Sequence, residues 1–406
     1  MPDSSEPGTT RPSRELSRQV AIVGVGETDY GVDYKAARSK EPGYAPPDPE
    51  DLAARAFERA LADSGLKRRD IDGLSVSFTY GGPDPGAMAK TLGIQPRYAV
   101  QAPGMMAGVI PPAVEALASG KCDTMALVYA VASRAIGRKY GGATYQGVGP
   151  TSYYYYAPWG WSSQAAHWAF MFRYYQATYG ATEEDLGSVA VLLRKNATLN
   201  EKAVMRTPLT TQDYLDSRYI VRPLHLFDMC LVNDGGVCLI LRKADMSRGL
   251  PHAPVLVAGW GDSHIHQSKM RDMVKERLCP QMQEAGTQAL AMARMELSEI
   301  HHFQGYDASS IHLVNQVEGY GLVKPGEGLD FCKEGHMAIG GKLPVNTSGG
   351  MLSEAYMHGW NHVAEATRQL RHEVGVRQVK GIQTSMFSLA TTESAHPLIF
   401  VRGAQA

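Results

Sequence analysis

The chain contains an internal repeat at a long offset. Residues 22–28 (IVGVGET) and 256–263 (LVAGWGDS) each form a short apolar run that ends in Gly-x-Gly, an acid and a hydroxyl residue. Residues 60–71 and 289–300 both begin with Ala-Leu-Ala and end with Ile at the same internal spacing. Such a match indicates that one α/β unit has been duplicated. A chain of 406 residues is too long for one simple core, so we expect two fused halves with sheets layered between helices.

Local patterns predict several elements of the first half. Residues 20–25 and 125–131 are apolar runs of the kind found in buried strands. Asp48-Pro49 is a typical helix start, because Pro is favoured in the first turn and acids follow it. Gly65 closes the same helix, and apolar residues lie on one face between these ends.

Three further segments are expected to be irregular. Residues 31–47 are polar and contain Pro and Gly, which predicts a loop. Residues 233–236 (NDGG) lie between apolar runs and predict a hairpin turn. Residues 151–161 (TSYYYYAPWGW) form the most aromatic segment. We favour a packed loop at a subunit contact for this segment, and the alternative is the wall of a tunnel for a bulky apolar substrate.

The glycine-rich stretch at residues 340–370 is the best candidate for a ligand site. Residues 343–345 predict a strand, residues 346–350 a turn of small residues, and a helix is expected from about Ala355. Two consecutive glycines let a ligand approach the backbone, and N–H groups at a helix start suit an oxyanion or a phosphate. The candidate substrate or oxyanion residues are therefore Asn346, Ser348, Gly349 and Gly350. The alternative is a strand-to-helix corner that binds nothing.

Composition excludes several classes of protein. The net charge of −1 implies no broad basic surface for nucleic acid. No apolar run approaches the length of a membrane span, and residues 1–18, rich in Pro and Ser, are expected to be a mobile tail and not a signal peptide. The five cysteines form no CxxC pair, so we expect neither a zinc ribbon nor disulfides, and a reduced, cytoplasmic protein: Cys122, Cys230, Cys238, Cys279 and Cys332.

Residues 345–350 (VNTSGG) resemble the VNxxGG turn in the C-terminal active-site loop of the thiolase superfamily. The chain is most similar to the thiolase-like lipid-transfer-protein branch, which includes steroid side-chain aldolases, and the resemblance runs from about Gln19 to Arg402. It implies an α/β fold in which two duplicated βα halves stack as α/β/α/β/α. The halves would be residues 19–253, with the aromatic loop region inserted, and residues 254–406. It also implies a homodimer whose active site lies where loops of both halves meet.

The chain departs from the thiolase pattern at each catalytic position. The place of the nucleophilic cysteine falls at about Pro103-Gly104, and residues 385–394, the counterpart of the late CxG turn, contain no Cys. The place of the GHP histidine falls on Tyr356, and the Asn or His at the strand end of the repeat is Tyr306. Acyl-cysteine chemistry is thus expected to be absent. Two tyrosines at these places resemble the steroid side-chain aldolases.

This resemblance implies an enzyme that uses Tyr306 and Tyr356 as catalytic acid and base. The expected reaction is retro-aldol cleavage of a bulky β-hydroxyacyl-CoA, such as a steroid side-chain thioester, to a ketone and a short acyl-CoA such as propionyl-CoA. No cofactor is expected beyond the coenzyme A of the substrate, and no metal. The family also implies a small partner with an OB-fold and a zinc ribbon, because this chain lacks cysteines for its own ribbon.

Two other functions remain open at this point. The chain could be a thiolase or acyltransferase that uses a displaced cysteine, for which Cys332 is the candidate near the C-terminal loops. It could also be a catalytically silent subunit that binds acyl-CoA. His358 and His362 have a spacing that can bind metal, although we favour a solvated or packed pair. Asp307 either orients Tyr306 or caps the next helix, and we favour the cap.

Overall fold

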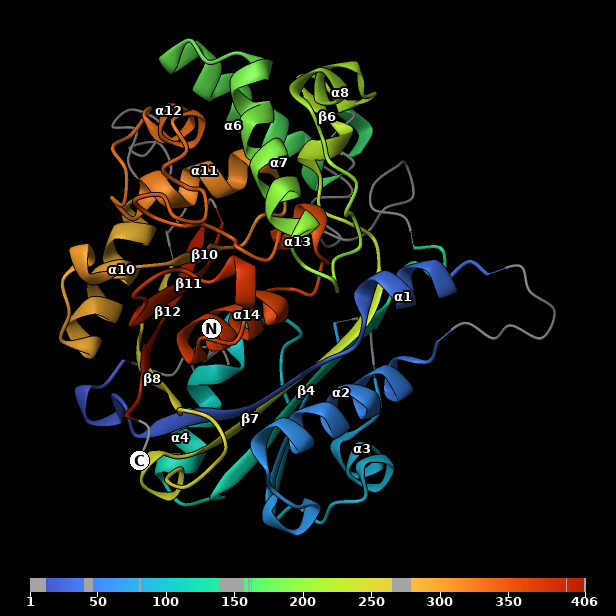
Figure 1. Ribbon diagram of the computed structural model, residues 1–406, viewed down its shortest axis with the longest axis vertical. Coiled ribbons are helices and arrows are strands. Elements are labelled where there is room, and N and C mark those ends of the chain that lie inside the picture. Colours follow the sequence, from blue (N-terminus) through green and yellow to red (C-terminus); the bar gives the residue numbers. More distant parts are fainter. Residues whose placement is uncertain are drawn as a thin grey trace, which may run out of the picture.

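The computed structural model describes residues 12–39, 47–79, 82–138, 157–159, 161, 163–264, 279–391 and 393–404. Within these residues, ten strands form one mixed sheet in the order β10-β11-β12-β8-β1-β7-β4-β2-β3, with β9 paired to β12. Figure 1 shows the long strands β1, β7 and β4 crossing the molecule diagonally. The sheet consists of β1 (Val20–Glu27), β2 (Gly73–Ser77), β3 (Tyr98–Gln101), β4 (Thr124–Ala132), β7 (Asp234–Lys243), β8 (Val255–Trp260), β9 (Ser263–His264), β10 (Phe303–Gly305), β11 (Thr384–Ala390) and β12 (Ser394–Arg402).

The helices cover both faces of this sheet and one end of it. Figure 1 shows α2 and α3 on one side of the molecule, α10 on the other, and α6, α7 and α8 together at one end. A small ribbon of β5 (Tyr219–Val221) and β6 (Leu224–His225) lies apart from the main sheet. The helices are α1 (Tyr30–Ala36), α2 (Pro49–Ser64), α3 (Pro85–Leu92), α4 (Ile110–Ala118), α6 (Gln164–Tyr179), α7 (Glu183–Thr198), α8 (Thr211–Asp216), α10 (Pro280–Ala293), α11 (Ser310–Gly319), α12 (Gly328–Lys333), α13 (Gly350–Ser353) and α14 (Trp360–Arg371).

The two halves of the sheet have the same topology. In the first half β2 pairs in parallel with β4, β4 pairs antiparallel with β7, and β7 pairs antiparallel with β1. In the second half β10 pairs in parallel with β11, β11 antiparallel with β12, and β12 antiparallel with β8. This correspondence confirms the predicted α/β fold with two duplicated βα halves.

Repeated glycines explain why the duplicated sequence keeps its Gly-x-Gly pattern. A Cβ at Gly26 would lie 2.0 Å from the carbonyl oxygen of Ala56 on α2, and a Cβ at Gly261 would lie 1.9 Å from that of Ala285 on α10. Each half therefore packs a helix so closely on the end of its first strand that only glycine fits there. The equivalent contacts place α2 and α10 on the outer faces of their respective halves.

The halves meet through a short strand pairing and a shared middle layer. Strand β1 joins β8 at two residue pairs, Ala21 with Leu256 and Ile22 with Val255. Helices α4 and α14 contribute to one buried apolar cluster that also contains strand residues of both halves. Helix α14 contacts β1 and β7 of the first half as well as β11 and β12 of the second. The middle layer of the predicted α/β/α/β/α stack is thus formed by α4 and α14.

Several local predictions are confirmed. Asp48 caps α2 by accepting a hydrogen bond from the Glu50 amide, and Gly65 ends the helix with a positive φ of 69°. The apolar runs become the fully buried strands β1 and β4. No helix in the described part of the chain is both long and apolar enough to cross a membrane.

Two segments predicted to be irregular are ordered elements. Part of the predicted loop is helix α1, which begins after Asp29 and buries Tyr30. Asp29 accepts a hydrogen bond from the Val32 amide, a cap that propensity alone did not reveal. The predicted hairpin turn at 233–236 is the start of β7, where Asp234 pairs with Ala132. Tertiary pairing with β4 overrides the turn composition there.

The helix predicted from Ala355 begins later. Residues 350–353 form the short helix α13, and α14 starts only at Trp360, after Gly359 adopts a positive φ of 90°. Residues 354–359 therefore do not continue one helix, and most of them are buried. Most of the aromatic segment 151–161 lies outside the described residues, so neither interpretation of it is tested.

Candidate active site

The fold brings the two predicted tyrosines together. Tyr306 follows β10 directly, where its amide donates to the carbonyl of Ser388 at 2.9 Å and its carbonyl accepts from the Gln316 side chain at 2.9 Å. Tyr356 lies between α13 and α14, and its amide donates to Asn233 Oδ1 at 2.7 Å. The two hydroxyl oxygens are 2.9 Å apart, and either one can be the donor.

The environment of the pair is apolar and largely closed to water. Tyr306 has 6% of its surface exposed, and Tyr356 is half-buried at the edge of the same core cluster. Both tyrosines belong to the second half of the chain, and the contact with Asn233 ties Tyr356 to the first half. Loops of both halves thus meet at the tyrosines. A catalytic role for the tyrosines stays a prediction at this point.

Asp307 holds the surroundings of the pair in place. Its carboxylate accepts hydrogen bonds from the amides of Met351 at 2.9 Å and Leu352 at 3.2 Å, and His362 Nε2 lies 2.8 Å away. Asp307 therefore caps α13 and not the next helix in the sequence, α11, which Ser309 caps. The carboxylate neutralises the positive end of the helix dipole.

The glycine-rich turn directs its polar side chains into the protein. The Asn346 amide nitrogen donates to the carbonyl of Gly305 at 2.9 Å, and its oxygen accepts from the Gly305 amide at 2.8 Å. Ser348 donates to Glu354 at 2.7 Å. Gly349 and Gly350 have positive φ angles of 106° and 58°. The N–H groups at the start of α13 already bind Asp307, so the predicted oxyanion role of this turn stays a prediction.

Glu354 is a buried acid that the sequence analysis missed. Its carboxyl group receives hydrogen bonds from Asn200, Ser348 and Asn361, each at 2.7–2.8 Å. Burial, followed by the charges of Glu27 and Glu365, raises the pKa of Glu354 to about 8. Ser348 and Asn361 lie close to Glu354 in the sequence, whereas Asn200 is distant, and only the fold brings it to this carboxyl group.

The ring of His358 packs against the ring of Tyr356. Its ring centroid lies 4.4 Å from that of Tyr356, and its Nδ1 shares a short hydrogen bond with the hydroxyl of Tyr129 on β4. Burial lowers the pKa of His358 to about 3, so the imidazole is neutral at physiological pH. His358 and His362 thus bond to Tyr129 and Asp307 respectively, and both side chains are packed in the interior.

All five cysteines lie in surroundings that disfavour a thiolate. Burial raises the pKa of Cys279 and Cys332 to about 11 and that of Cys122 and Cys230 to about 12. It also raises the pKa of Cys238. A protonated thiol attacks acyl groups slowly, so the raised pKa values do not favour a displaced catalytic cysteine.

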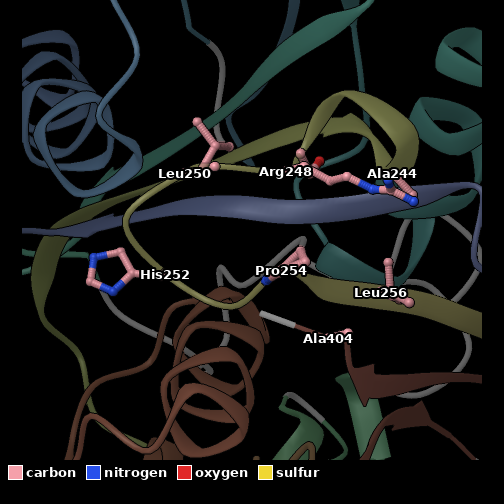
Figure 2. A pocket seen from close by; sticks show the side chains of 10 residues that line it. Ala244, Arg248, Leu250, His252, Pro254, Leu256 and Ala404 are labelled. Atoms are coloured by element: carbon pink, nitrogen blue, oxygen red, sulfur yellow. The ribbon is translucent and has the colours of Figure 1, made fainter. Parts of the chain in front are cut away.

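A surface hollow lies at the opposite end of the sheet strands from the tyrosines. Figure 2 shows its lining, which includes Arg248, His252, Pro254 and Leu256. The hollow adjoins the end of β7 and the start of β8. Strand β10 runs in the same direction as β8, and Tyr306 follows the end of β10, so the tyrosines lie at the other end of the strands. His252 Nδ1 lies 2.6 Å from Glu373. This hollow is therefore separate from the candidate active site.

Comparison with known proteins places these features in a family. The family model described as "Thiolase C-terminal domain-like" matches residues 259–398. A steroid side-chain-cleaving aldolase of Thermomonospora curvata is 36% identical over 374 residues, which cover 88% of this chain and 91% of the relative. A 17-hydroxy-3-oxo-4-pregnene-20-carboxyl-CoA lyase of Mycobacterium tuberculosis is 34% identical over 93% of this chain and 97% of its own length.

A solved structure agrees with these sequence relatives. The structure of an "Ltp2-ChsH2(DUF35) aldolase" superposes with a TM-score of 0.83 and 33% identity, over 95% of this chain and 98% of that chain. The agreement extends over both halves and not only over the matched C-terminal domain. The chain is therefore a lyase that belongs to the thiolase superfamily, in the lipid-transfer-protein branch that contains the steroid side-chain-cleaving aldolases.

Proposed function

We propose that this protein cleaves a bulky β-hydroxyacyl-CoA by a retro-aldol reaction, with a steroid side-chain thioester as substrate. The products are a ketone and a short acyl-CoA such as propionyl-CoA, and coenzyme A enters only as part of the substrate. The observation that carries the proposal is the 2.9 Å contact between the hydroxyls of Tyr306 and Tyr356 in an apolar setting. The names of the relatives support the substrate class.

In the proposed reaction, one tyrosine hydroxyl accepts a proton and the other donates one. One tyrosine oxygen takes the proton of the β-hydroxyl, and the electrons of that O–H bond form the ketone carbonyl. The bond between the α- and β-carbons breaks, and its electron pair enters the thioester as an enolate. The other tyrosine gives a proton to the α-carbon, which completes the acyl-CoA. A proton passes across the contact between the hydroxyls, so the pair ends in its starting state.

We also propose that the turn formed by Asn346, Ser348, Gly349 and Gly350 borders the thioester. Because Asn346 and Ser348 direct their side chains into the protein, a donor to the enolate oxygen would be a backbone N–H group of the turn. Glycine at both positions permits the positive φ angles that shape the backbone of this turn.

A small partner protein with an OB-fold and a zinc ribbon completes the proposed enzyme, which we expect to be a homodimer of this chain in complex with it. The solved relative is named as an aldolase together with a DUF35 protein, and this pairing supports a partner of this kind. The partner's absence should lower turnover, so activity is best measured with it present.

The test is turnover of a tertiary β-hydroxyacyl-CoA by wild type, Tyr306→Phe and Tyr356→Phe, with ketone and acyl-CoA followed by mass spectrometry. We expect each variant to lose about 100-fold or more in kcat, since each removes one acid–base group. Tyr219→Phe is the matched control, because the Tyr219 hydroxyl bonds only to a surface acid, Glu183, among the contacts described. Full activity in both active-site variants would overturn the mechanism.

A second measurement separates the two tyrosines and the remaining alternatives. The enzyme should exchange the α-protons of propionyl-CoA with deuterated water, because this is the reverse of enolate protonation. Only the variant that lacks the α-carbon acid should lose the exchange. A silent binding subunit would show neither exchange nor sensitivity to the tyrosines. Inactivation by iodoacetamide would instead point to a displaced cysteine.

A further inference from the structure

Three metal-ligating side chains converge outside the candidate active site. Asp262 follows β8, His264 is the last residue of β9, and His396 lies near the start of β12. One ligand atom from each residue lies within 4.8 Å of the others. The strand register accounts for this grouping. Ser263 pairs with Ala395 and His264 with Ser394, so the same antiparallel register places Asp262 opposite His396.

The alternation of side chains along β9 completes the arrangement. Asp262 and His264 are two residues apart in extended chain, which directs both side chains to one face. Two contacts hold this segment in position: the Asp262 amide donates to the side chain of Gln288 at 3.0 Å, and Ser263 donates to Glu284 at 2.8 Å. Both partners lie on α10, so the ligand segment is held against a helix and not on a free loop.

The contacts within the group have the lengths of a coordination site. His396 Nδ1 lies 2.9 Å and His264 Nε2 lies 3.1 Å from the same oxygen, Asp262 Oδ1. Oδ1 is buried, and both imidazoles converge on this one oxygen. Two ligands bound at about 2.1 Å lie roughly 3.0 Å apart if the angle at the ion is near 90°, and roughly 3.4 Å apart in a tetrahedron. The observed separations match the former.

We propose that Asp262, His264 and His396 bind one divalent first-row transition-metal ion, with water in its remaining positions. The side chains of His264 and His396 are 59% and 24% exposed, so an ion and its water molecules can reach the site. The ion would clamp β9 to β12 beside the β11–β12 hairpin. Tyr306 lies at the same end of the strands, because it follows the end of β10. The proposed role of the ion is therefore structural support at the end of the sheet that carries the tyrosines.

Calorimetric titration of chelator-treated, tag-free full-length protein with Zn²⁺ and Co²⁺ tests the proposal. We expect one equivalent to bind with a dissociation constant on the order of 1 µM or below. The bound Co²⁺ should show the weak visible absorption of a six-coordinate ion. Asp262→Asn and His264→Ala should each weaken binding by roughly 10- to 100-fold. The metal should also raise the thermal midpoint of wild type only.

His336→Ala is the matched control variant. His336 has similar exposure to His396, 23%, and lies 3.1 Å from one acid, Glu334, without a third ligand grouped with them in the described chain. It should leave binding unchanged. Circular dichroism and the metal-free midpoint show whether each variant is folded, and the exposed His264 position is the safest of the three. Failure to bind Zn²⁺ and Co²⁺, or stoichiometric binding that survives both Asp262→Asn and His264→Ala, would overturn the proposal.

Discussion

At the scale of single residues, the reacting pair consists of two hydroxyls beside an imidazole, and the Asp307 carboxylate follows Tyr306 directly. The tyrosine hydroxyls are paired with each other, and the imidazole of His358 beside them is uncharged because burial lowers its pKa to about 3. A largely apolar setting suits a reaction that moves one proton between two oxygens and a carbon, because it keeps competing water away from the reacting groups. A cysteine nucleophile would require the opposite environment, one that stabilises a thiolate.

A second buried histidine gives a prediction for the pH dependence of stability. His302 bonds to Ser385 at 2.9 Å and Thr347 at 3.1 Å, and burial lowers its pKa from 6.5 to about 4. The unfolded chain gains a proton here below pH 6.5, whereas the folded chain does so only near pH 4. Stability is thus fully present above pH 6.5 and is lost as the pH falls toward 4, by about 3 kcal/mol for this one group.

The variant His302→Gln should flatten this acid-side loss while it lowers stability at pH 7. Denaturant unfolding at pH 4, 5, 6 and 7 measures the slope, and the other buried histidines contribute equally to both proteins. His301→Gln is the control, because His301 is exposed and adjacent in sequence. An unchanged slope in His302→Gln would contradict the prediction.

At the scale of elements, Asp307 joins the end of β10 to α13 and α14. Asp307→Asn keeps the shape but turns one acceptor into a donor that faces the amide of Met351 or Leu352. A buried amide left without an acceptor costs about 1–3 kcal/mol, so we expect a loss of this size in the free energy of unfolding. Because Asp307 follows Tyr306 directly, kcat should also fall by tenfold or more, with little change in KM.

Asp213→Asn is the comparison for this prediction. Its carboxylate also caps a helix, α8, through the amide of Thr210 at 2.9 Å, but at the exposed surface. It should lower the free energy of unfolding by less than Asp307→Asn does and leave kcat unchanged. Guanidinium unfolding and steady-state kinetics measure both effects. A similar loss in the two variants would mean that Asp307 acts only as an ordinary cap.

At the scale of the whole molecule, the two halves share one strand pairing and one buried core cluster. Strand β1 pairs with β8, and Ile22 and Trp260 lie in the same buried cluster as α4 and α14. We therefore predict that residues 19–253 and 254–406 do not fold when expressed separately. The intact chain should unfold in one transition that near-UV and far-UV circular dichroism report at the same temperature. Two separate transitions, or one half with native-like near-UV signals, would contradict this.

The sequence alone predicted much of the architecture because local pattern and duplication carry it. The Gly-x-Gly repeat and the buried runs predicted the paired halves, and the structure shows the reason in the close contacts of Gly26 and Gly261. Asp48 and Gly65 marked the ends of α2 because caps depend on neighbouring residues only. The family resemblance singled out Tyr306 and Tyr356, although no local property separates them from the other 18 of 20 tyrosines.

Only the tertiary structure decided which distant groups meet. The start of β7 at Asp234 has the composition of a turn, and pairing with β4 makes it a strand. Asp307 caps α13 and not α11, and Glu354 receives a hydrogen bond from the distant Asn200. Asp262 lies opposite His396 only through the register of β9 with β12. Sequence periodicity determines which face of an element is buried, whereas strand order and register determine what that face contacts, and these depend on the whole fold.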